Sequence, residues 1–213
     1  DNVIIASDTT FVSPATNPRS TSVPGGGSWD VRYESEIQSL ELVGCRNSCG
    51  YRVSYGFRYA SLDERLQLLS SQNDDYRFAT ENDLYGFQLG VATTLWQNDC
   101  RLRVDADIKV GVYLNQADAA SSAGGILLDS SGRNDETSAA FLGELGLDAV
   151  YDVSCCLSLR AGYQLLFVDG VALAADQVPN TGNLAAGSPN VPVSVDSSSL
   201  LYHGLNVGVE YRR

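Results

Sequence analysis

The chain has 213 residues, a formal net charge of −12 at pH 7 and a pI near 4.3, and its length suits a single domain. Such an excess of acidic residues leaves no basic patch to displace counterions from phosphates, which excludes nucleic acid as an expected partner. No apolar run approaches the roughly 18 residues of a membrane-spanning helix, so insertion into a membrane would have to use strands.

The N-terminal region, residues 1–28, is expected to be a strand followed by a linker. The chain begins at Asp1 without an initiator Met or a signal-like stretch, which is typical of a processed, exported protein. Residues 3–12 are predicted to form the strand, and the tract rich in Pro, Gly and Ser that follows is predicted to be the linker. Residues 29–213 are expected to form the body of a barrel.

Alternation of apolar residues with charged or small ones recurs along this body, whereas helical spacing is almost absent. In residues 102–113 the apolar side chains stand at even positions, and charged residues or glycine stand at most of the odd positions. Only a strand separates side chains in this way. The segments with strand character are 30–43, 50–60, 84–96, 102–113, 141–151, 157–167 and 201–211.

The connections between these segments alternate between tight turns and long polar loops. The turns are expected at 44–50, 97–100 and 152–155, and the loops at roughly 61–82, 117–136 and 170–198. This asymmetry is typical of outer-membrane barrels.

Seven strands would close a barrel with a parallel seam. Placing the N-terminal strand between the first and the last of them restores antiparallel pairing and gives an even number of strands. We therefore predict an all-β fold, an antiparallel up-and-down β-barrel of about eight strands. The N-terminal residues expected to pair, or to be donated to a neighbour, are Val3, Ile4, Ile5, Phe11 and Val12.

The apolar faces are expected to point outward. An eight-stranded barrel has an interior just wide enough for side chains, and the bulky apolar residues are too many to fit there. The opposite faces carry glycines and charges of both signs, which survive burial only when paired. The predicted interior network consists of Arg52, Arg58, Arg103, Asp105, Asp107, Lys109, Glu144, Asp148, Arg160 and Glu210. The alternative is a soluble barrel or sandwich whose charged faces meet water.

All five cysteines fall in or beside the predicted tight turns: Cys45, Cys49, Cys100, Cys155 and Cys156. The topology gathers them at one end of the barrel, and disulfides are expected between Cys45 and Cys49 and between Cys100 and either Cys155 or Cys156. One thiol is left over for pairing between molecules. A metal cluster is the alternative, but no CxxC pair or clustered histidines support it.

Features of an enzyme are weak in this sequence. His203 is the only histidine, and it falls on the expected outer face without a GxSxG motif or an obvious carboxylate partner, so packing is favoured over general-base duty. The glycines at 25–27 lack the helix and the lysine of a phosphate loop. We expect no catalysis, no cofactor and no bound metal.

Four stretches carry a resemblance to a known family: GFRYASLDERL (56–66), NDLYGFQLGVATTLW (82–96), FLGELGLDAVYDVSCCLSLRAGYQLLFVDGVALAADQV (141–178) and HGLNVGVEYRR (203–213). In these the chain resembles the β-barrel porins of planctomycete-type bacteria. The resemblance implies an outer-membrane barrel and says little about activity. The chain departs from the family in its short length and in ending Tyr211-Arg212-Arg213 instead of on a terminal aromatic residue.

Two functions of different classes follow. The first is a non-enzymatic outer-membrane or cell-surface barrel with a structural or porin-like role, in contact with the lipid bilayer. The second is a subunit of an extracellular filament or surface lattice, in which residues 3–12 enter the barrel of a neighbouring copy. Both functions require that the chain is exported, and the second function also requires that copies of the chain assemble into a polymer. A barrel enzyme acting on lipids would need a polar catalytic cluster at a rim, which the sequence does not offer.

Overall fold

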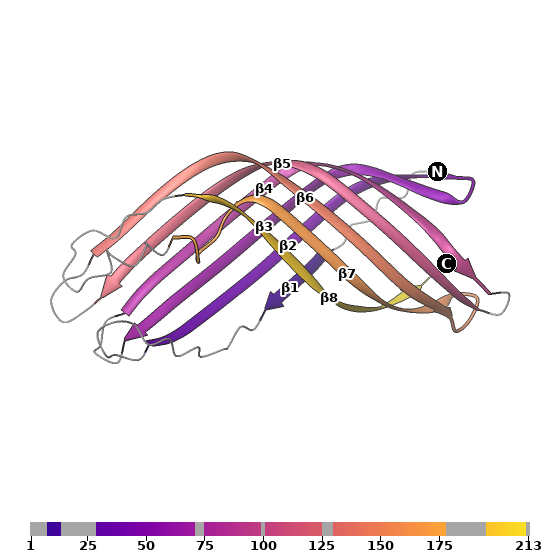
Figure 1. Ribbon diagram of the computed structural model, residues 1–213. Helices are drawn as coiled ribbons and strands as arrows, with labels where there is room; N and C mark the ends of the chain where they lie inside the picture. The colour runs from indigo at the N-terminus through magenta and orange to yellow at the C-terminus, as the bar shows by residue number, and fades with distance from the viewer. Residues whose placement is uncertain are drawn as a thin grey trace.

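A computed structural model describes residues 8–13, 29–70, 75–98, 101–124, 130–177 and 195–211. Within them the chain forms one sheet of eight antiparallel strands, arranged in space in the order of the sequence (Figure 1). This confirms the predicted all-β, up-and-down architecture with about eight strands. The strands are β1 (Asp8–Ser13), β2 (Trp29–Ser48), β3 (Tyr51–Ser70), β4 (Asp75–Gln97), β5 (Leu102–Gly124), β6 (Ser130–Asp152), β7 (Leu157–Ala172) and β8 (Ser197–Tyr211).

Tight turns join the strands at one end of the sheet, which we call the turn side. Cys49 and Gly50 alone connect β2 to β3, and Gly50 adopts a positive φ of 85° that favours glycine. The turn between β6 and β7 is closed by the amides of Val153 and Ser154, which donate to the carbonyl of Leu157. The opposite end of the sheet is the loop side.

The strands are longer than the sequence pattern predicted. β4, β5 and β6 each have 23 residues, so most of the expected loops 61–82 and 117–136 are in fact strand. The expected loop at 170–198 is also partly strand, because β7 continues to Ala172 and β8 begins at Ser197.

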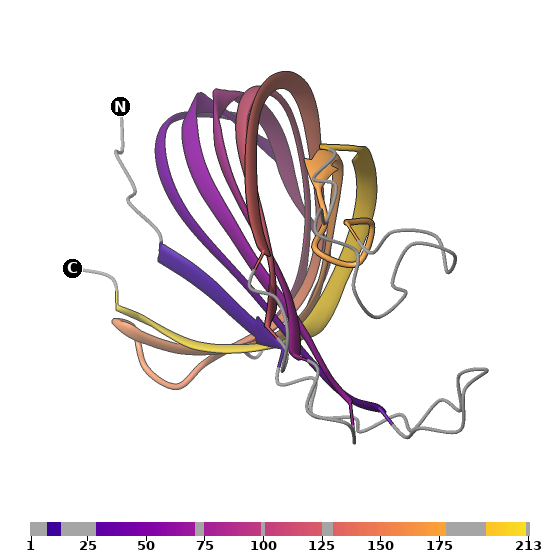
Figure 2. The same cartoon turned by 90° about the vertical axis from the view of Figure 1, so that its left-hand side faces the viewer.

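The sheet is curled into a half-barrel, as Figure 2 shows. The predicted N-terminal strand is present as β1, which pairs antiparallel with residues 35–40 of β2 in the same chain. Val3, Ile4 and Ile5 lie outside the described residues. Within the described part of the chain, β1 and β8 form no ladder with each other, so the pairing that would close the cylinder is not formed there.

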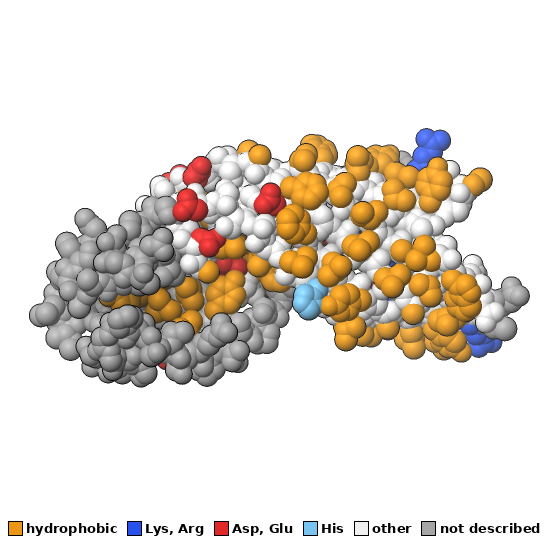
Figure 3. All heavy atoms as spheres, in the orientation of Figure 1, with side chains coloured by type: hydrophobic (Ala, Val, Ile, Leu, Met, Phe, Trp, Pro, Cys, Tyr) orange, Lys and Arg blue, Asp and Glu red, His pale blue; other side chains and the backbone are white. Residues whose placement is uncertain are grey.

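The two faces of the curled sheet differ sharply in chemistry. The convex face carries large apolar side chains on the turn side and acidic side chains towards the loop side, as Figure 3 shows for one view. We call the apolar zone the belt, and its members include Phe57, Phe87, Ile108, Val112, Phe141, Leu145, Leu147, Leu159, Phe167, Leu205 and Val207. None of the described residues forms a helix long and apolar enough to cross a membrane.

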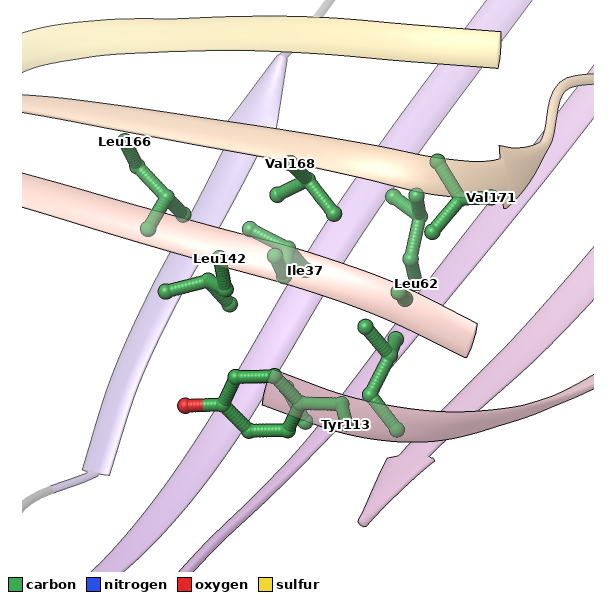
Figure 4. Packing of buried hydrophobic residues seen from close by; sticks show 10 residues of the cluster. Ile37, Leu62, Tyr113, Leu142, Leu166, Val168 and Val171 are labelled. Carbon is green, nitrogen blue, oxygen red and sulfur yellow. The ribbon is translucent and has the colours of Figure 1, made fainter. Parts of the chain in front are cut away.

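The concave face is buried and has two layers. On the loop side, apolar side chains from six strands, β2 to β7, meet in one cluster (Figure 4). Its largest buried members include Ile37, Leu62, Leu84, Leu142, Leu166 and Val168. The turn-side layer is charged. The sequence analysis did not predict the apolar layer: Leu62 fell in a predicted loop, and Ile37, Leu84, Leu142 and Leu166 lie in predicted strands, on faces that were expected to be polar or had no clear pattern.

Candidate functional site

The charged layer of the concave face centres on Arg58 of β3, which is 2% exposed. Its Nη1 lies 2.8 Å from Oε2 of Glu144 on β6 and 3.1 Å from Oε1 of Glu41 on β2. Nη2 donates to the hydroxyl of Ser39 at 3.1 Å. Because β3 and β6 are not neighbours in the sheet, the contact with Glu144 connects two opposite parts of the curled wall.

A second cation completes this arrangement. Nζ of Lys109 on β5 lies 3.2 Å from Oε2 of Glu41 and 3.2 Å from Oε1 of Glu144. Two amides add hydrogen bonds, from Gln88 to Glu41 at 2.9 Å and from Gln164 to Glu144 at 2.6 Å. Two carboxylates and two cations therefore share one buried group in which the charges balance, as buried ions require.

Nearer the turns, a second set of pairs follows the strand ends. Arg160 on β7 donates to Asp148 on β6 at 2.6 Å, and the side chain of Asp148 is 2% exposed. Arg103 on β5 lies 2.9 Å from Asp105 and 3.4 Å from Asp152.

Two glycines on neighbouring strands make room for the carboxylates of Asp148 and Asp107 on the concave face. A Cβ at Gly162 would lie 2.1 Å from Oδ1 of Asp148, and one at Gly146 would lie 2.4 Å from Oδ1 of Asp107. The two carboxylates can lie flat on neighbouring strands only because those positions have no side chain. This explains why glycine recurs on the charged face of the sequence.

The charged layer borders a hollow of about 880 Å³ on the turn side. Its lining combines charged and polar side chains with apolar ones: Glu41, Lys109, Asp148, Arg160 and Asn206 belong to the first kind, and Val91, Ile108 and Val207 to the second. Within the described residues, no group of three or more His, Cys, Asp or Glu side chains is placed to hold a metal ion.

The structure places the predicted interior residues as follows. Arg58, Lys109, Glu144, Asp148 and Arg160 lie on the concave face in the pairs described above, and Asp107 lies with them. Arg52 lies at the turn end, where it donates to Asn47 at 3.2 Å. The side chain of Glu210 lies outside the described residues.

Glu41 and Gln88 belong to the charged layer but were not among the residues predicted from the sequence. Glu41 was missed because β2 has no regular apolar face, although the hairpin register that pairs Glu41 with Arg58 could have indicated it. Gln88 stood on the correct face of its segment, but only the charged residues of that face were considered.

Among the described residues no disulfide is formed, so the predicted Cys45–Cys49 bond is absent, whereas the bond predicted for Cys100 falls on a residue outside them. Cys45, Cys49, Cys155 and Cys156 are free thiols, and Cys100 lies outside the described residues. The nearest pair is Cys155 and Cys156, whose sulfurs are 3.4 Å apart, well beyond the S–S bond length of about 2.05 Å.

His203 lies on the convex face near the loop-side border of the belt (Figure 3). Its Nδ1 is 2.5 Å from the hydroxyl of Tyr163, and the two rings lie 5.9 Å apart. The only histidine thus pairs with a tyrosine on an exposed surface, away from the charged layer.

The fold and the concave face together define a protein of the β-barrel class, with an apolar convex surface and ion pairs inside. A family model described as "Putative beta barrel porin-7" matches residues 4–212 of the chain. The chain therefore belongs to this family, which confirms the resemblance to β-barrel porins. No curated protein and no solved structure matches it.

Proposed function

We propose that this chain is a non-enzymatic outer-membrane barrel protein with a porin-like or structural role, whose belt contacts lipid and whose interior is closed by paired charges. The single observation that carries this proposal is the belt. Its side chains are large, apolar and exposed, such as Phe87 at 72%, Leu205 at 84% and Val207 at 86%. An apolar surface this continuous is costly in water and is typical of a surface that meets lipid or another protein.

The height of the belt supports lipid as its partner. In β6 it extends from Phe141 to Tyr151 and in β8 from Leu201 to Tyr211, and a tilted transmembrane strand needs about 9–11 residues. Aromatic residues mark both borders, as in the girdles of outer-membrane barrels. Phe57 and Phe141 lie at the border of the belt nearer the loops, and Trp96 and Tyr151 lie at its border nearer the turns.

The interior supports a closed barrel more than an open channel. The buried group around Arg58 balances two cations against two carboxylates, and the apolar cluster lies beyond it on the loop side. In a wide aqueous pore, water would fill the part of the interior that these side chains occupy.

Purification in detergent tests the membrane proposal. A folded barrel should resist dodecyl sulfate at room temperature and migrate faster on a gel than the boiled chain, and it should float with liposomes after reconstitution. A chain that stays soluble without detergent and sediments away from liposomes would contradict the proposal.

A second function, strand donation between copies, is favoured by the edge of β8. In the described part of the chain this strand pairs only with β7, along 15 residues, and such an edge accepts a further strand. The donor would be residues 3–12 of a neighbouring copy, whose residues 8–12 would exchange their pairing with their own β2 for the edge of β8. Deleting residues 1–12 distinguishes the two functions: loss of polymers with folded monomers remaining favours donation, whereas an unchanged distribution of sizes contradicts it.

A further inference from the structure

We propose that residues 170–177 form a plug, anchored inside the barrel, that seals the loop side of the interior. The inference rests on the proposed function, because a seal matters only if the interior is otherwise a path for solutes. It concerns a segment that the sequence pattern assigned to a loop.

The plug begins where β7 leaves its neighbour. The β6–β7 ladder ends at the pair of Phe141 with Asp169, and the β7–β8 register shifts between Asp169 and Val171. Gly170 lies at this shift with a φ of 81°, and a Cβ there would lie 2.5 Å from the carbonyl oxygen of Ala139. Only glycine allows this bend, which turns the chain towards the concave face.

Of the residues after the bend, four are buried (Val171, Ala172, Ala174 and Gln177), whereas Ala175 and Asp176 are exposed. Val171 and Ala174 are 0% exposed and Ala172 is 1% exposed. Val171 belongs to the apolar cluster of the concave face (Figure 4), and Ala174 packs with Leu66 and Phe78. A segment that only connected two strands at the rim would remain largely in contact with water.

The walls hold the backbone of this segment through polar side chains. Asn82 on β4 donates to the carbonyl of Ala172 and accepts from its amide, both at 2.8 Å. Because β4 is not adjacent to β7 in the sheet, these two bonds cross the interior. Asn115 on β5 supports them by donating to the carbonyl of Gly170 at 3.1 Å and to Oδ1 of Asn82 at 3.1 Å.

Glu64 on β3 provides a second anchor. Its Oε2 accepts from the amide of Ala174 at 3.0 Å, while Oε1 accepts from the hydroxyls of Tyr33 and Ser35. The residue is 1% exposed. A buried carboxylate is costly unless it is fully hydrogen-bonded, so its use here indicates a specific fixing of the segment.

The position of the plug gives it a function. It lies on the loop side of the charged layer, where it adds Val171 to the apolar cluster. The plug and the apolar cluster therefore lie between the hollow on the turn side and the loop side. Release of residues 173–177, which follow the end of β7, would open a route between the hollow and the loop side without any change in the strands.

Thiol labelling tests the plug directly in folded protein in detergent micelles. In a background with the five cysteines replaced by serine, Ala174→Cys serves as the reporter, with a water-soluble maleimide as the probe. We expect protection in the parent and roughly tenfold faster labelling in Asn82→Ala and Glu64→Ala, because each loses buried hydrogen bonds to the segment. The matched controls Asn134→Ala and Glu81→Ala, on the same sheet but exposed, should leave the rate unchanged. A parent reporter that labels as fast as Thr137→Cys would overturn the proposal, and so would folded anchor variants that leave the rate unaltered.

A second variant keeps the proposal testable if Asn82→Ala or Glu64→Ala does not fold. Replacing residues 173–177 by a glycine–serine segment of equal length leaves every strand intact. In planar bilayers with potassium chloride we expect it to conduct at least several-fold more than the parent. An inserted variant that conducts no more than the inserted parent would overturn the seal. Failure of both proteins to insert would contradict the membrane function, and the labelling result would then decide the plug alone.

Discussion

Arg58 is the residue on which the charge balance of the concave face depends most. It contacts Glu41 and Glu144 from two different strands, and its removal would leave both carboxylates buried with Lys109 as their only cation. We expect Arg58→Met to lower the free energy of unfolding by about 3–5 kcal/mol, measured as the urea concentration at which the fast-migrating form is lost.

The control is Arg133→Met, which removes an ion pair of similar geometry on the convex face. Arg133 lies 2.9 Å from Asp118, but its side chain is 73% exposed, so the loss of stability should be far smaller than that of Arg58→Met. Adding Glu144→Gln to Arg58→Met should recover part of the stability. Equal losses in the two single variants would contradict the role assigned to Arg58.

Gly162 gives a prediction about the wall itself. Gly162→Ala places a methyl group against Oδ1 of Asp148 and the carbonyl of Leu147, and we expect a loss of about 1–3 kcal/mol from this overpacking. At Gly208 a Cβ meets nothing within 4 Å, so Gly208→Ala should be nearly neutral. Thermal loss of the fast-migrating form measures both, and matching midpoints would argue against the close packing of Asp148.

Much of the charged layer could be predicted from the sequence, because alternation alone separates Arg58, Lys109 and Glu144 from the apolar residues beside them. Their partners could not be predicted, since a pattern along one strand does not say which strands face each other across the interior. Glu41 shows the limit: its strand carries polar residues on both faces, so alternation gave no signal for it.

A row of carboxylates crosses five neighbouring strands on the convex face, just beyond the belt. The ladders place Glu36, Asp63, Glu81, Asp118 and Asp135 opposite one another in succession, and like charges in such positions are destabilising. Partial burial of this largely exposed side chain raises the pKa of Asp63, and Glu36 and Asp83 raise it further, while Arg65 opposes them.

The raised pKa of Asp63 sets the sign of a pH effect. The folded chain binds this proton more readily than the unfolded chain, so ionisation of Asp63 destabilises the fold as pH rises through the raised value. We expect Asp63→Asn to stabilise the protein at pH 7 by at most about 0.5 kcal/mol, because the residue is exposed. The gain should vanish below pH of about 3.9, where the carboxyl is protonated in both states.

Asp75 serves as a control, because its pKa is shifted in the opposite direction to that of Asp63. Burial opposes its ionisation, but hydrogen bonds from Arg77 and Gln67 outweigh this and lower its pKa. Asp75→Asn should therefore destabilise the protein at neutral pH, and its effect should fade as pH falls through the lowered pKa. Unfolding in urea at pH 3.5, 5 and 7 measures both variants, and effects of the same sign would contradict the electrostatic explanation.

The strand centres could be predicted, whereas the loop-side extensions could not. In β5 the pattern is clear up to Val112, but Ala117, Ala119 and Ser121 then line the concave face with small side chains that give no apolar contrast. In β3 the apolar residues change faces, from Phe57 on the convex side to Leu62 on the concave side. A change of face removes the period-two signal, so this part was predicted to be a loop.

The molecule as a whole has an apolar belt between a turn end and an acidic loop-side extension. A charge in the middle of this belt should be far more costly than one beyond it. We expect Leu145→Arg to lower the free energy of unfolding in liposomes by about 2–4 kcal/mol and Thr137→Arg by about 0–1 kcal/mol. Both positions lie on the exposed convex face of β6. They share a strand and a face, and they differ only in their distance from the middle of the belt. Equal costs would mean that the belt does not lie in hydrocarbon.

The most direct measurement is the accessibility of nitroxide spin labels on the reconstituted protein, in a background without the native cysteines. Labels at Leu145 and Thr137 are compared for collision with molecular oxygen, which partitions into lipid, and with a polar nickel chelate, which stays in water. We expect collisions with oxygen to dominate at position 145 and collisions with the nickel chelate to dominate at position 137. A label at position 145 that collides mainly with the nickel chelate would show that the belt faces water or protein, and would contradict the membrane role.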